Sequence, residues 1–568
     1  MPTTKPKKPP ACDACKARRV LCHPQPNGAP CPRCAEKDVE CTTTPSLRGR
    51  RRKNPGASPE SLIWLDTASP SVSLDAAQAL EKRQGPDLNP SLVAHLFQCF
   101  DNDSSVHSRH PLMARISIQT DVRAVSFQLH LLPPERRAVA LCIIATGSLV
   151  SFHEAILGDG PRPESLTDPI FFSLRRNLLG CGARRVQTHR VLHMEALKAA
   201  WDCGAMLQVS KENAVSCLLL DVLEQTDTCG PTRPWAAAYV SHLRALAAEW
   251  RTSTVPEREG AEWAGYLMGE VLSATSSRKP ILITHSDQLL LSGLEPASAE
   301  ALLASLDASV RPSDLIVLLL ALRPYIFHVT CLARQLWDTI TGDNVRLSPL
   351  SEVAVIRLLS ALSVTHAILT RLLERIDTAL LVPVPKTSPA HVNHDLLRKC
   401  AMVISTSFAI IALSLHRELE YRERTGTTDE SAHIQARMGL LRAQARDMAL
   451  LGTRALCRAI RQLPPIHFLE IKLSTLRDYA QFALADAEAA PFVSHEQLAD
   501  LETLAQEIAL QGYSLDILAS PETALLLSRL EVYLANAQNA LNGPIPDMFM
   551  PAEEQWILNA TAEVGTFW

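Results

Sequence analysis

Six cysteines lie within thirty residues near the start of the chain, and they constrain what this region can fold into. Their spacing is C-x(2)-C-x(6)-C-x(8)-C-x(2)-C-x(6)-C, formed by Cys12, Cys15, Cys22, Cys31, Cys34 and Cys41. The chain has 568 residues and 15 cysteines, so the nine others are scattered over a much longer stretch. A cluster this dense forms either a disulfide knot or a metal site.

A metal site is the better interpretation of the cluster. The first eleven residues are basic and proline-rich and lack the apolar stretch of a secretory signal, so we expect an intracellular protein with reduced thiols. In each C-x(2)-C pair, two intervening residues allow both sulfurs to face one ion. Two such pairs, each followed by a third cysteine after six residues, therefore predict metal binding.

The cluster consists of two copies of one ligand loop. Residues 12–22 align with residues 31–41, cysteine on cysteine and Val20 on Val39. Two copies imply two metal ions, and two tetrahedral sites need eight ligand positions. Six thiols fill eight positions if two of them bridge both ions. Pseudo-symmetry makes equivalent positions the bridges, and Cys12 and Cys31 are the natural pair.

This spacing, with Lys16, Arg18 and Arg19 between the second and third cysteines, resembles the fungal zinc binuclear cluster, Zn(2)-C6, of transcription factors. The resemblance covers residues 12–41, and we expect the zinc cluster domain to comprise residues 11–42. It implies two Zn(II) ions, with the first and fourth cysteines bridging them, and double-stranded DNA as a partner. It also implies that a basic residue at the position of Arg18 or Arg19 helps to read a CGG-like triplet.

The two copies differ in charge. Between its cysteines the first carries Lys16, Arg18 and Arg19 against one acid, whereas the second carries two basic and three acidic residues. Because arginine bonds guanine O6 and N7 together, we expect a short helix after Cys15 to present the basic side chains to the major groove. The alternatives are a structural zinc knot for protein contact and a merely solvated basic face.

Positive charge continues beyond the cluster. Residues 1–60 hold thirteen Lys and Arg against five Asp and Glu, a formal charge of +8, whereas the whole chain is −4. We expect residues 1–10 to be a disordered basic tail and residues 43–90 to be a basic arm and flexible linker. The candidate DNA-binding residues of the arm are Arg48, Arg50, Arg51, Arg52 and Lys53. This run predicts a nuclear localisation signal, a phosphate-binding arm or both; a solvated linker is the alternative.

The linker gives little sign of a dimerisation element. Its one candidate coiled coil, residues 74–82, is barely one heptad, and three or four are needed. A homodimer would therefore form through the large domain, not through an evident coiled coil.

The remainder of the chain predicts a large all-α regulatory domain over residues 91–540. Leucine and alanine are abundant, and residues 136–154, 351–375 and 397–424 are apolar at helical spacing. The most hydrophobic run, residues 401–415, is shorter than the ~20 residues that span a bilayer. It predicts a buried core helix, and we expect no membrane partner.

Two stretches of this domain resemble the fungal-specific transcription factor domain, or middle homology region. One is residues 233–244, a helix led by tryptophan, and the other is residues 261–273, followed by a loop at Arg278 to Pro280. We expect Trp235, Trp263 and Tyr266 to be core residues.

The sequence gives no sign of an enzyme. It contains no G-x-S-x-G, P-loop, H-E-x-x-H or full dinucleotide fingerprint. The segment Gly180 to Gly182 is an isolated short match that predicts a loop. Histidines such as His95 and His242 have no paired acids at useful spacing, and the cysteines outside the cluster predict core thiols.

Acidic and aromatic residues alternate in the tail, residues 541–568, which contains no Lys or Arg. This pattern suits an activation segment that folds on a coactivator or another part of the transcription machinery. A tail docked on the helical domain fits the pattern equally well.

The sequence as a whole predicts a nuclear, zinc-dependent RNA polymerase II transcription factor that reads a CGG-like triplet. The tail suits an activator, and the choice between activator and repressor stays open. The alternative is a zinc-stapled scaffold or corepressor subunit without sequence readout of its own.

Overall fold

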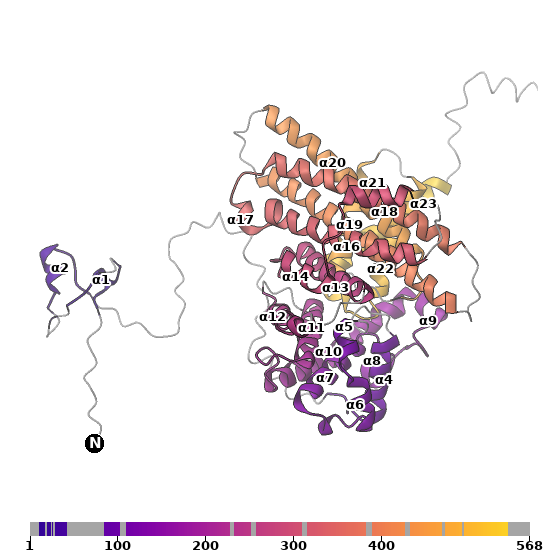
Figure 1. Ribbon diagram of the computed structural model, residues 1–568, viewed down its shortest axis with the longest axis horizontal. Helices are drawn as coiled ribbons and strands as arrows, with labels where there is room; N and C mark the ends of the chain where they lie inside the picture. The colour runs from indigo at the N-terminus through magenta and orange to yellow at the C-terminus, as the bar shows by residue number, and fades with distance from the viewer. Residues whose placement is uncertain are drawn as a thin grey trace, which may run out of the picture. The chain divides into compact units, whose positions relative to one another are not determined.

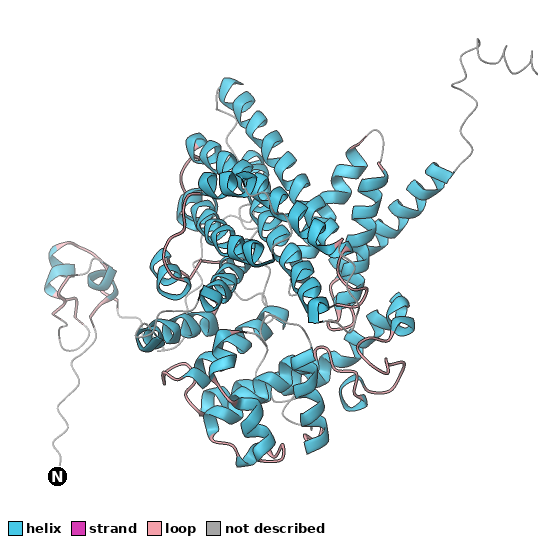
Figure 2. Cartoon of the chain, turned by 45° about the vertical axis from the view of Figure 1, so that its right-hand side comes forward, coloured by secondary structure: helices cyan, strands magenta, loops and turns pink. Residues whose placement is uncertain are grey.

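The computed structural model describes most of the chain, as two compact units, residues 1–71 and 72–568. The described residues are 11–17, 20–23, 25, 29–42, 85–102, 110–227, 232–250, 257–308, 315–381, 389–425, 432–467, 472–490 and 494–542. Throughout these ranges all regular secondary structure is helical, as Figure 2 shows.

In its described residues the small unit contains two helices of equal length, α1 (Asp13–Ala17) and α2 (Pro32–Glu36), which contact each other. Each holds the second cysteine of a C-x(2)-C pair at a buried position, Cys15 in α1 and Cys34 in α2. Proline suits the first position of α2 because its fixed φ matches the helix and no amide donor is lost there.

The first part of the large unit packs around α7, a helix in which every residue from Ala138 to Ser148 is buried. Helices α4, α10 and α11 surround it (Figure 1). The apolar spacing over residues 136–154 predicted this helix, but α7 ends at Ser148. The elements are α4 (Pro90–Asn102), α5 (Pro111–Arg115), α6 (Ile118–Ala124), the 3-10 helix η3 (Leu129–Leu131), α7 (Pro134–Ser148), α8 (Glu154–Leu157), α9 (Pro169–Ser173), α10 (Arg175–Asp202), α11 (Lys211–Asp227) and α12 (Pro234–Trp250).

The second part of the large unit contains the longest helices. The 37-residue α19 packs against α18, α20 and α13. The elements are α13 (Glu257–Ser276), α14 (His285–Ser292), α15 (Ala299–Ala308), α16 (Leu315–Leu336), the π-helix η4 (Trp337–Thr341), α17 (Asp343–Arg346), α18 (Glu352–Leu380), α19 (Pro389–Thr425), α20 (Ala432–Arg461), α21 (Leu473–Ala489), α22 (His495–Gln511), the 3-10 helix η5 (Ile517–Ala519) and α23 (Pro521–Asn542).

Helices α18 and α19 are long and apolar enough to cross a membrane, by length and composition alone. The apolar window of α19 is 61% buried within the body and that of α18 is 39% buried, and core helices pass the same test. The predicted core run 401–415 lies in α19, and most of its side chains are buried, so that prediction is confirmed. The helix is much longer than the fifteen-residue run suggested.

One continuous hydrophobic core joins the first and last helices of the large unit, from Leu92 in α4 to Leu530 in α23. Trp235 and Trp263 are buried in this core as predicted, whereas Tyr266 is half-buried. The predicted tryptophan-led helix is α12, and the second predicted helix, α13, ends in a loop at Arg278.

The loop predicted at Gly180 to Gly182 is wrong, because both glycines lie inside α10. The amide of Gly182 donates to the carbonyl of Gly512, 2.9 Å away, at the end of α22. A Cβ at Gly182 would meet the carbonyl oxygens of Leu515 and Gly512 at 2.0 and 2.4 Å. The glycine therefore allows α10 to approach the backbone that follows α22.

We expect Gly182→Ala to lower the free energy of unfolding by about 2 kcal/mol or more, because two backbone carbonyls must move away from the new methyl group. Gly180→Ala is the matched control two residues away. A Cβ there meets nothing within 4 Å, so this substitution should leave stability unchanged or raise it by up to ~1 kcal/mol. Urea unfolding followed by circular dichroism measures both, and equal midpoints for the two variants would contradict the close approach.

Candidate metal centre

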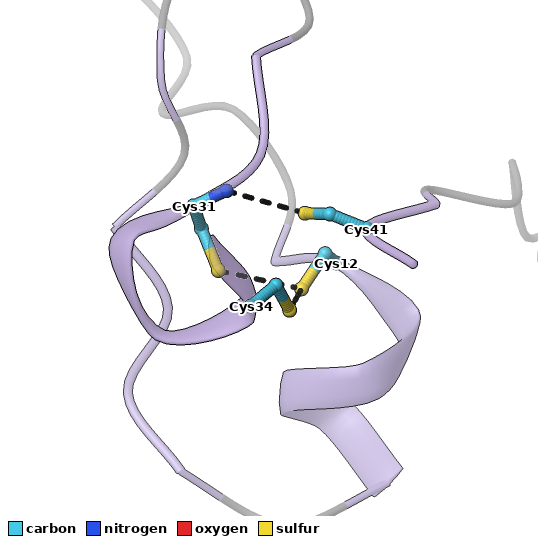
Figure 3. Close-up of side chains that lie close together, drawn as sticks. All are labelled: Cys12, Cys31, Cys34 and Cys41. Carbon is cyan, nitrogen blue, oxygen red and sulfur yellow. Dashed lines mark hydrogen bonds between the residues drawn. The ribbon is translucent and has the colours of Figure 1, made fainter. Parts of the chain in front are cut away.

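The six predicted cysteines come together in the small unit and form two overlapping groups of four sulfurs. Within each group all sulfurs lie within 4.8 Å of one another. The first group comprises Cys12, Cys15, Cys22 and Cys31, and the second comprises Cys12, Cys31, Cys34 and Cys41, which Figure 3 shows. Cys12 and Cys31, the two predicted bridges, are the members that both groups share.

The separations between the sulfurs suit tetrahedral coordination. At a metal–sulfur distance of about 2.3 Å, as for zinc, the edge of a sulfur tetrahedron measures about 3.8 Å. Cys12 Sγ lies 3.9 Å from Cys31 Sγ and 3.7 Å from both Cys34 Sγ and Cys22 Sγ. Cys15 Sγ lies 3.7 Å from Cys31 Sγ. This cluster can hold zinc or another thiophilic metal.

Backbone amides help to place the third cysteine of each copy. The amide of Cys12 donates to Cys22 Sγ at 3.4 Å, and the amide of Cys31 donates to Cys41 Sγ at 3.3 Å. The two bonds occupy equivalent positions, and each closes a loop from the first to the third cysteine of its copy. The duplication seen in the sequence is therefore also a duplication of geometry.

The matched valines mark the same symmetry at the ends of the two helices. The amide of Val20 donates to the carbonyl of Cys15 at 3.1 Å, and the amide of Val39 donates to that of Cys34 at 3.0 Å. Each bond turns the chain out of a one-turn helix toward the third cysteine.

The two shared sulfurs also differ electrostatically from their neighbours. A hydrogen bond from the amide of Cys15 lowers the pKa of Cys12 to about 6, and one from the amide of Cys34 lowers the pKa of Cys31. Desolvation and then hydrogen bonds with neighbouring thiols raise the pKa of Cys15 to about 12. Amides at the start of a helix stabilise the thiolate, which is the form that ligates metals.

Of the predicted DNA-binding residues, the structure describes Lys16, which is exposed on α1. Its Nζ lies 3.5 Å from Asp13 Oδ1, an i,i+3 ion pair between exposed side chains that contributes little stability. The sequence analysis counted Asp13 only as a charge, although its helical spacing from Lys16 signals this contact. The other predicted residues lie outside the described part of the chain: Arg18, Arg19, Arg48, Arg50, Arg51, Arg52 and Lys53.

The cysteines of the helical body behave as predicted core thiols. Cys142 and Cys217 are buried and Cys331 is half-buried, and desolvation raises the pKa of Cys217 to about 12. In the described residues, only the two cysteine groups of the small unit have three or more metal-ligating atoms close together. His95 instead contacts Ser151 Oγ at 2.9 Å.

No family model, curated protein or solved structure matches this chain. The cysteine spacing and the positions of the six sulfurs therefore identify the candidate site. Both point to a compact group of thiols that could hold metal, with two sulfurs common to both groups.

We expect Cys12→Ser to remove more metal from the full-length protein than Cys22→Ser, because Cys12 belongs to both sulfur groups and Cys22 to one. Native mass spectrometry after purification with zinc and reductant measures the metal bound per chain. Cys331→Ser, a change in the helical body, is the control and should retain the full metal content. Equal losses in the first two variants would contradict the sharing of Cys12.

Proposed function

We propose that this protein is a nuclear transcription factor that binds two Zn(II) ions and reads a CGG-like triplet in double-stranded DNA. The observation that carries the proposal is the pair of four-sulfur groups that share Cys12 and Cys31. In this proposal each zinc has four sulfur ligands, and the two shared thiolates bridge the ions.

Charge supports the first copy as the DNA-reading half. Lys16 is exposed on α1, and Arg18 and Arg19 follow it in the sequence. At the position equivalent to Lys16, α2 has Ala35, and the acidic Glu36 lies next to it. A DNA groove lined by phosphates favours the basic copy, and an arginine can discriminate guanine by about 1–3 kcal/mol.

The basic arm would add affinity without adding sequence information. Arginine and lysine contacts to phosphate position a protein on DNA, whereas contacts to base edges specify the sequence. Residues 48–53 suit the first role because they are consecutive and almost all cationic. The same run would also serve as the nuclear localisation signal.

The helical body and the tail would carry regulation. The body offers a core large enough to fold without metal, and any homodimer would form through it. The acidic and aromatic residues of the tail, which lie outside the described residues, would contact a coactivator.

Selection of a random-sequence DNA pool with the zinc-loaded full-length protein tests this function. We expect enrichment of a CGG-like triplet and about tenfold or greater loss of affinity for it in Arg19→Ala, because a bidentate contact with guanine is lost. Arg33→Ala is the control: Arg33 is exposed on α2, in the acidic copy, and its loss should leave the base preference unchanged.

If a protein that retains both zinc ions selects DNA without any preferred sequence, the proposal that it reads a DNA sequence would be overturned. That result would favour the alternative, a zinc-stapled scaffold or corepressor subunit. Metal analysis of Arg19→Ala must match the parent protein for the comparison to hold.

Replacement of Arg50, Arg51 and Arg52 by alanine should weaken binding to all DNA sequences alike. Each lost phosphate contact flattens the slope of log affinity against log salt concentration by about 0.9. Fluorescence anisotropy with a selected and a scrambled duplex, over a series of salt concentrations, measures the slope. A changed ratio between the two duplexes would instead assign base contacts to the arm.

A further inference from the structure

The helical body contains a cavity of about 200 Å³ among the end of α13, the π-helix η4, α19 and α21. Ile410 and Leu413 of α19 form an apolar part of its wall, while hydroxyl and charged side chains form the rest. A liquid water molecule takes up about 30 Å³, so the space corresponds to about six waters or one small organic molecule. All the elements that line the cavity belong to the large unit.

Tyr479 lines this cavity, and its buried hydroxyl lacks a hydrogen-bond partner among the described residues. Tyr479 is fully buried, and its hydroxyl makes no hydrogen bond within the described part of the chain. Desolvation raises its pKa well above the ordinary tyrosine value, so the hydroxyl stays protonated and is a donor. A buried hydroxyl without an acceptor destabilises the folded protein, and a ligand oxygen would offset that cost.

Positive charge exceeds negative charge around the cavity. Its only lining carboxylate among the described residues, Asp478, already pairs with the guanidinium of Arg417. Arg278 also lines the cavity, is exposed and forms no ion pair in the described ranges; its guanidinium carbon lies 5.9 Å from the centre of the Tyr421 ring. A second cationic side chain lies next to the cavity: Lys472 Nζ donates a hydrogen bond to Oγ of Ser277, a lining residue, at 2.8 Å.

Irregular backbone surrounds the same space. Arg278 has a φ of +52°, in the left-handed region that non-glycine residues rarely adopt because it is strained. On another side of the cavity, Thr341 ends the π-helix η4. π-Helical turns and strained residues occur disproportionately at functional sites, and here both line one cavity.

We propose that this cavity binds a small monocarboxylate with an apolar chain of about four to six carbons. Its carboxylate would pair with Arg278, and one of its oxygens would accept the hydrogen bond of Tyr479. Its chain would pack on Ile410 and Leu413. A phosphate fits less well, because only one lining guanidinium lacks a carboxylate partner in the described residues and part of the wall is apolar.

Binding would stabilise the junction of four elements that are distant in sequence. A ligand that binds only the folded protein raises its stability in proportion to the logarithm of ligand concentration over Kd. Occupancy would therefore tie α13 and η4 to α19 and α21. This inference is independent of the zinc cluster and of DNA binding.

Isothermal titration of the full-length protein with butanoate, pentanoate and 3-methylbutanoate tests the site. We expect saturable binding of at least one acid, and none of its neutral amide, because the amide cannot pair with Arg278. Arg278→Gln should raise Kd at least tenfold. Arg424→Gln, at an exposed position near the end of α19 and outside the cavity, is the control and should leave Kd unchanged.

Tyr479→Phe separates a ligand contact from a structural role. Removal of an unsatisfied hydroxyl should leave the ligand-free protein as stable as before or more stable, while Kd rises several-fold. Absence of binding by all three acids, equal binding of acid and amide, preference for inorganic phosphate, or unchanged Kd in both cavity variants would each overturn the proposal. Binding should persist after treatment with a zinc chelator, so failure of the DNA-binding proposal leaves this result intact.

Discussion

The contact between Cys12 and Cys31 is the constraint on which the small unit depends. Its buried cluster consists of the sulfur-bearing side chains Cys12, Cys15, Cys31 and Cys34, and no larger apolar side chain is buried there among the described residues. Thiols make a poor hydrophobic core, but thiolates that ligate a metal can supply about 10 kcal/mol or more of folding free energy. The shared pair lets six residues serve two four-sulfur groups, and so keeps the unit small.

The helical body is stabilised by different means. Its apolar core extends from α4 to α23, and buried ion pairs fix how some helices meet. Arg233, just before α12, pairs with Asp221 of α11 at 2.7 Å and with Glu270 of α13 at 2.9 Å, all three nearly inaccessible to solvent. Removal of one partner from such a network is strongly destabilising, because it leaves another buried charge unpaired. At the cavity, by contrast, the buried hydroxyl of Tyr479 has no hydrogen-bond partner among the described residues.

Local patterns in the sequence predicted what depends on local spacing. The cysteine intervals predicted the grouping and the shared pair, and apolar periodicity predicted α7, α18 and α19. The prediction of a loop at Gly180 to Gly182 was wrong for a tertiary reason. Gly182 lies where α10 approaches the backbone of Gly512, which is far along the chain, and a side chain there would clash with that backbone. The cavity was equally inaccessible to sequence reasoning: Arg278 and Tyr479 have no periodic relation in the sequence and line one cavity only in the folded body.

In the cysteine cluster, the buried groups are the same in both copies of the loop, whereas the exposed side chains differ. The features that hold the sulfurs in place repeat from one copy to the other. They are the one-turn helix, the hydrogen bond from a backbone amide to the sulfur of the third cysteine, and the valine whose amide bonds back to the helix. Side chains that face solvent do not repeat, as Lys16 against Ala35 illustrates. Metal binding needs both copies to keep the same geometry, whereas an asymmetric polyanion such as DNA can favour one of them. Selection for a recognition surface would therefore change the exposed charges of one copy while the buried sulfurs of both stay fixed.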